Sequence, residues 1–226
     1  YGYVFGAAQG WTGGMTTDED FEAVFGPLFF GPAHERILEA IHQLARTNAL
    51  PGVAQVNRSH TILALFDEPL TGATVEGEDA LPAETLTKMR MLAEEAATTV
   101  RLSDHGEASD GPAPGHPREL TLREIGFAAR LTDYAARKVT LSQEIRQGLR
   151  GPDLDADRIY RYILALKALN VELERLRAEF ETAWLARARR SEIHVALGYY
   201  ANLRARYRAA INWLETQRRA LTKGQS

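Results

Sequence analysis

Apolar residues recur at intervals of three and four positions over most of the second half of the chain. The repeats occupy three long segments, at about 120–149, 156–187 and 191–221. Apolar residues at this spacing form a stripe on one side of an α-helix, and such a stripe is buried against neighbouring helices. The stripe residues are Leu122, Ile125 and Ala129; Ile159, Ile163, Leu166, Leu169, Leu173, Leu176 and Phe180; and Ile193, Leu197, Tyr200, Leu203, Tyr207, Ile211 and Leu214. Because only short links separate the last segments, we expect antiparallel neighbours in a helical bundle.

Capping residues and helix breakers indicate further helices in the first half of the chain. Thr17 precedes three acidic residues and can cap a helix that the Gly26-Pro27 pair should end or kink. A second helix is expected at about 33–49 and a third at about 82–102, each with apolar residues at helical spacing.

The connections between these helices are marked by turn-forming residues. Residues 53–81 are irregular, and the apolar run at 61–66 within them fits either a short strand or a helical turn. Residues 103–118 are rich in Gly, Pro, Asp and His, which predicts an exposed loop. Asp155 and Ser191 stand where the second and third long helices should be capped.

The first fourteen residues are apolar and then rich in glycine. They predict a short buried strand ending near Trp11, followed by a turn at Gly13-Gly14. A domain rarely begins inside its own core, because chain ends are usually exposed. We therefore expect further sequence upstream of Tyr1. A signal peptide could lie there too, which leaves the cellular compartment open.

Composition narrows the classes of function. The 226 residues carry a formal net charge of −3, and 45% of them are hydrophobic, which is enough to build a core. Lysine and arginine are spread along the helices without forming a basic stripe, so no nucleic-acid partner is expected. The absence of cysteine excludes disulfides and thiolate metal sites. No apolar run reaches the roughly 20 residues of a membrane helix, so no membrane partner is expected.

Two patterns resemble reactive sites but have simpler explanations. Asp67-Glu68 is an adjacent acid pair after an apolar run, and paired carboxylates can act as acid and base. Acids before a proline more commonly form a solvated turn, and that interpretation is favoured here. A helical metal site needs histidines four residues apart and a further ligand, whereas His34 and His42 are eight apart. We predict no metal, no cofactor and no catalytic residue in the chain.

Trp11 is the one candidate for binding substrate. An indole at the end of a strand and followed by glycines can present a flat apolar face to a sugar ring. On residue type alone a core position is favoured, because aromatic side chains mostly pack in cores. Trp184 and Trp213 lie near the helical stripes, and we expect them to pack between helices.

The opening of the chain resembles a known enzyme family. Residues 3–11 (YVFGAAQGW) resemble the last barrel strand of the family 20 glycoside hydrolases, the β-N-acetylhexosaminidases. In that family a strand of small residues leads to a tryptophan that lines the sugar-binding pocket. Residues 20–31 look like the last barrel helix and the segment after it, and residues 184–193 are similar to the helical extension of divergent bacterial members.

The resemblance implies a mainly α chain in three parts. Residues 1–50 would be the end of a truncated (β/α)8 barrel, with its last strand and helix. Residues 51–81 would form an irregular connection, and residues 82–226 a helical bundle domain.

The resemblance also implies a reaction and one site residue. The family removes terminal N-acetylhexosamine by substrate-assisted retaining hydrolysis, in which an Asp orients the acetamido group and a neighbouring Glu protonates the leaving oxygen. That Asp-Glu pair would fall upstream of Tyr1, so the chain alone is expected to be inactive. Only Trp11 carries over, as a wall of the subsite for an N-acetylhexosaminide substrate. Many members have a Glu where this chain has Gly13, so the sugar hydroxyl contact made by that Glu is absent here or supplied by another residue.

Two other functions fit the same sequence. The long apolar stripes also suit a non-enzymatic helical scaffold or interaction domain. A different sugar-active barrel family would share the tryptophan at a strand end without the acetamido mechanism.

Overall fold

The predicted mainly α class is confirmed. The computed structural model describes residues 2–52, 59–105 and 117–224, and within these residues the regular elements are helices, with no strand. The helices are α1 (Gly2–Thr12), α2 (Asp18–Phe30), α3 (His34–Arg46), α4 (His60–Phe66), α5 (Ala83–His105), α6 (Pro117–Arg150), α7 (Ala156–Arg187) and α8 (Ile193–Gly224), with 3₁₀ turns η1 (Gly31–Ala33) and η2 (Thr47–Ala49).

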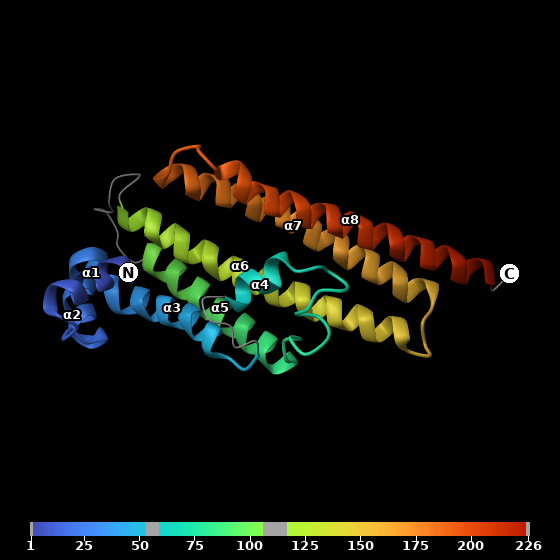
Figure 1. Ribbon diagram of the computed structural model, residues 1–226, viewed down its shortest axis with the longest axis horizontal. Coiled ribbons are helices and arrows are strands. Elements are labelled where there is room, and N and C mark those ends of the chain that lie inside the picture. The colour runs from blue at the N-terminus through green and yellow to red at the C-terminus, as the bar shows by residue number, and fades with distance from the viewer. Residues whose placement is uncertain (1, 53–58, 106–116, 225–226) are drawn as a thin grey trace.

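Helix α6 is the centre of the arrangement. It contacts α5, α4, α7 and α3, and α8 packs mainly on α7. Figure 1 shows α7 and α8 as an antiparallel pair along one side of α6, with α5 and α3 along the other side. The expectation of antiparallel neighbours is therefore confirmed. Helices α1 and α2 lie at one end of the molecule, and the C-terminus of α8 lies at the other end (Figure 1).

Two apolar clusters form the core. The larger one joins α4, α5, α6, α7 and α8, and the smaller one joins α2, α3, α5 and the first turns of α6. All predicted stripe residues are buried except Phe180 and Leu197, which are partly exposed. The three long stripes thus meet one another across the bundle, as their spacing predicted.

The ends of two helices confirm the predicted caps. The Thr17 hydroxyl accepts a hydrogen bond from the backbone N–H of Asp20 at 3.1 Å. The Asp155 carboxylate accepts one from the N–H of Arg158 at 2.6 Å. Each cap satisfies a backbone donor that has no partner within its own helix.

Other boundaries differ from the predictions. Helix α2 does not end at Gly26-Pro27 but continues to Phe30. Gly26 packs closely against α3, because a Cβ added to it would lie 2.8 Å from the His34 ring. This packing between helices outweighs the tendency of Gly26-Pro27 to end a helix. Helix α8 begins at Ile193, and Glu192, at a φ of 65°, separates it from the expected cap Ser191.

The connections are more helical than expected. The apolar run at 61–66 lies in helix α4. Of the loop expected at 103–118, the first residues continue α5 to His105 and the last begin α6 at Pro117. The remainder of that loop, 106–116, and residues 53–58 of the irregular connection lie outside the described residues.

The predicted strand at the N-terminus is wrong. Gly2–Thr12 forms helix α1, and the turn at Gly13-Gly14 follows it with φ angles of 64° and 82°. A strand leaves its backbone N–H and C=O groups unpaired unless another strand lies beside it, and the described residues contain no such strand. A helix pairs these groups within the segment itself.

Candidate functional site

Helix α1 places Trp11 at the surface. The Trp11 side chain is 92% exposed, so the core position favoured by residue type is wrong. No residue of helix α1 is fully buried, and Phe5 packs edge-to-face on Phe21 of α2, with ring centroids 5.2 Å apart. The indole is therefore accessible, as a sugar-stacking residue has to be.

The other two tryptophans, Trp184 and Trp213, differ in how far they are buried. Trp184 is partly buried: it packs 5.7 Å from the Phe180 ring, and its indole N–H donates a hydrogen bond to the Arg189 carbonyl at 3.0 Å. Both partners are local, Phe180 on the same helix and Arg189 just after it, so these contacts do not test the prediction that Trp184 packs between helices. Trp213 is 47% exposed, so the prediction that it packs between helices is wrong.

The Asp67-Glu68 pair forms a turn rather than an acid–base site. Asp67 Oδ2 accepts hydrogen bonds from the Thr74 N–H at 2.7 Å and the Thr74 hydroxyl at 2.6 Å, and its Oδ1 accepts from the N–H of Glu68 at 2.9 Å. Glu68 pairs with Arg206 of α8 at 3.2 Å. The turn interpretation is confirmed. Each carboxylate is held by separate partners, so the two do not face a shared reaction site.

Lys138, on α6, is a buried amine that sequence reasoning missed. Its side chain is completely buried, and Nζ donates hydrogen bonds to the carbonyl oxygens of Ala64 at 2.8 Å and Asp67 at 2.6 Å. Burial lowers the pKa of Lys138 to about 7, although the nearby Asp67 and Glu68 carboxylates oppose that shift. The sequence contained an indication of this burial, because Lys138 lies four residues after Tyr134 and therefore on the same, apolar side of α6.

Three of the histidines lie within hydrogen-bonding distance of partners in the described residues. His34 Nδ1 lies 2.9 Å from the Gly31 carbonyl, and His42 Nε2 lies 2.8 Å from Glu22 Oε1. His60 is buried at the start of α4, with Nε2 3.3 Å from the Leu50 carbonyl. Over the described part of the chain, no three His, Cys, Asp or Glu residues gather in a way that could hold a metal ion.

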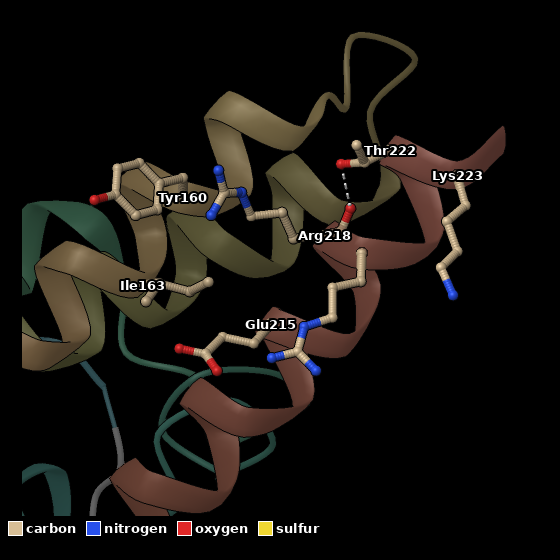
Figure 2. A pocket seen from close by; sticks show the side chains of 7 residues that line it. Tyr160, Ile163, Glu215, Arg218, Thr222 and Lys223 are labelled. Carbon is tan, nitrogen blue, oxygen red and sulfur yellow. Dashed lines mark hydrogen bonds between the residues drawn. The ribbon is translucent and has the colours of Figure 1, made fainter. Parts of the chain in front are cut away.

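Among the described residues, the hollows along α6, α7 and α8 include two between neighbouring helices. One, of about 400 Å³, lies between the first turns of α7 and the last turns of α8; Figure 2 shows its lining residues. Arg218 lies over the Tyr160 ring there at 4.4 Å, and Glu215 pairs with Lys167 at 3.4 Å. The other, of about 320 Å³, lies between α6 and α7 and is lined by Phe127 and several alanines. The linings contain no cysteine, serine or histidine and one or two carboxylates each, and their threonine hydroxyls, Thr182 and Thr222, donate to helix carbonyls.

Comparisons with known proteins give no relative for this chain. Protein-family models, curated proteins and solved structures were compared with it, and no match was found in any of the three.

Among the described helices, none is both long enough and apolar enough to span a membrane.

Proposed function

We propose that this chain belongs to a glycoside hydrolase of the hexosaminidase type, which removes terminal N-acetylhexosamine from carbohydrates. In this proposal residues 1–50 complete the catalytic barrel, Trp11 stacks on the sugar, and the bundle formed by α5–α8 supports the barrel from outside. The proposal rests on the resemblance of residues 3–11 to the family's last barrel strand. The structural observation that supports it best is the 92% exposure of Trp11.

The composition and exposure of α1 are compatible with a segment that would form a strand if neighbouring barrel strands were present. Its eleven residues contain no charged side chain and none of them is fully buried, while Tyr3, Val4 and Trp11 are exposed. Isolated helices of this length are marginal in water, and here side-chain packing adds little to hold the helix. Neighbouring strands would offer the same backbone groups a full ladder of hydrogen bonds and would cover the exposed apolar side chains.

The proposal assigns catalysis to residues outside this chain. The acetamido group of the substrate would attack the anomeric carbon, and an upstream Asp-Glu pair would orient that group and protonate the leaving oxygen. Asp67 and Glu68 do not supply this pair, because both are held in the turn between α4 and α5. Trp11 would add a flat apolar surface against the sugar ring.

The test is an assay of the polypeptide encoded at the natural locus, including whatever precedes Tyr1. It should release p-nitrophenol from p-nitrophenyl N-acetyl-β-glucosaminide, and residues 1–226 alone should not. Trp11→Ala should lower kcat/KM about tenfold or more through loss of stacking. Trp213→Ala is the matched control, because Trp213 is also exposed but lies on α8. A folded natural polypeptide with no such activity overturns the proposal.

A non-enzymatic scaffold is the second candidate, and the closed bundle favours it. The larger core cluster is built from α4–α8 without any residue of α1 or α2. A self-contained interaction domain should therefore keep its stability when residues 1–16 are deleted, and the natural polypeptide should lack glycosidase activity. Loss of activity on deletion, with the bundle intact, instead favours the hydrolase.

A further inference from the structure

Lys138 joins three parts of the fold at one point. Its Nζ reaches from α6 to the last turn of α4, where it binds the Ala64 carbonyl, and to the following turn, where it binds the Asp67 carbonyl. Arg206 of α8 reaches the same turn, donating a hydrogen bond to the Phe66 carbonyl at 3.0 Å. Helix α4 has only seven residues, and these side chains donate to carbonyls at its C-terminal end that have no partner within the helix.

The geometry at Nζ suits a neutral amine. A neutral lysine has two N–H donors, and the two carbonyl oxygens use both of them. An ammonium group has three N–H donors, and no third acceptor is found for Nζ among the described residues. The nearest carboxylates are engaged elsewhere, since Asp67 binds Thr74 and Glu68 pairs with Arg206. Protonation would therefore add an unpaired donor and a charge inside the core.

We propose that Lys138 is a proton-controlled latch, which holds α4 and the turn at residues 67–74 onto α6 as a neutral amine and releases them when it is protonated. The charged groups facing the latch are Asp67 and Glu68 from the turn and Arg206 from α8; His60 is the titratable group at the other end of α4. The two carboxylates favour the ammonium form, whereas burial and Arg206 oppose it.

The direction of the pH effect follows from the two states of the amine. In the released state Lys138 is in water, and its pKa returns to the ordinary value of 10.5, whereas burial lowers it to about 7 in the closed state. The released state binds more protons between these values, so the closed state weakens as the pH falls from 10.5 towards 7. Between pH 9 and pH 7 the opening equilibrium should rise by about fiftyfold, and below pH 7 it should level off.

Hydrogen exchange of α4 tests the latch directly. The reporters are the amides of Leu63 and Asp67, which hydrogen-bond to the carbonyls of Ser59 and Leu63. After correction for the intrinsic exchange rate, their protection in the wild-type chain should fall about fiftyfold between pH 9 and pH 7, while α7 amides change little. Lys138→Met keeps an apolar side chain of similar length but cannot titrate. In this variant the protection of the α4 amides should not show the fiftyfold fall between pH 9 and pH 7.

Three further measurements make the result decisive. Lys167→Met removes an exposed lysine and should behave as wild type, and His60→Gln should retain the pH dependence if Lys138 causes it. The Cε resonance of Lys138 in the wild-type chain should titrate near neutral pH, a measurement that requires no variant to fold. Equal pH dependence of α4 protection in wild type and Lys138→Met, or a Lys138 titration midpoint near that of exposed lysines, overturns the proposal.

Discussion

The hydrogen-bonded pair of Tyr134 and Tyr207 gives the sharpest prediction about stability. Both side chains are completely buried, between α6 and α8, and their hydroxyl oxygens lie 2.8 Å apart. The Tyr134 hydroxyl also donates a hydrogen bond to the Leu169 carbonyl at 3.3 Å. Tyr207→Phe removes one neutral hydrogen bond and should lower the free energy of unfolding by about 1 kcal/mol. Tyr134→Phe removes both hydrogen bonds, leaves the buried Tyr207 hydroxyl without this partner, and should cost about 2 kcal/mol.

The same pair predicts how stability changes at high pH. Burial raises the pKa of both Tyr134 and Tyr207 well above the ordinary value of 10, so both phenols stay neutral in the folded chain when exposed phenols ionise. Their contribution to stability is complete below pH 10 and is lost as the pH rises above it. At pH 11 each phenol should have lost about 1.4 kcal/mol, or about 3 kcal/mol for the pair.

Urea unfolding followed by circular dichroism at pH 8 and pH 11 measures this loss. Between pH 8 and pH 11 the wild-type chain should lose about 3 kcal/mol more stability than the Tyr134→Phe/Tyr207→Phe double variant. The difference reports on these two phenols, because the two proteins have all their other ionising groups in common. If both proteins lose the same stability, the two phenols are not held neutral by burial, and the reasoning is refuted.

Three other substitutions test particular contacts. Gly72→Ala should destabilise the fold by about 2 kcal/mol in urea unfolding, because its Cβ would lie 2.2 Å from the Asp67 carboxyl carbon and disrupt the turn; a change under about 0.5 kcal/mol contradicts this. Gly26→Ala should destabilise by about 1 kcal/mol although alanine favours helices, because α3 lies too close; a gain in melting temperature contradicts the packing seen here. Trp11→Ala should change stability by less than about 0.5 kcal/mol, and a larger loss shows that the indole packs in solution.

The helical class and most of the bundle core could be predicted from the sequence, because the signals are local. Apolar stripes at helical spacing identified the buried sides of α7 and α8, where residues such as Ile159 and Leu203 are almost completely buried. Thr17 and Asp155 marked helix starts because a cap acts within four residues of itself. The turn at Asp67-Glu68 was predictable for the same reason.

The conformation of the N-terminal segment and the environment of Lys138 depend on segments that are distant in sequence. An apolar segment such as residues 3–11 can be strand or helix, and the presence of partner strands decides which, so its sequence predicted a strand where the structure has α1. The environment of Lys138 depends on Ala64 and Asp67, more than 70 residues away, which only the packing of α4 on α6 brings together. Periodicity along the chain determined which sides of the helices are apolar. The tertiary structure decided which side chains meet there, because burial and hydrogen bonding depend on partners that no local pattern specifies.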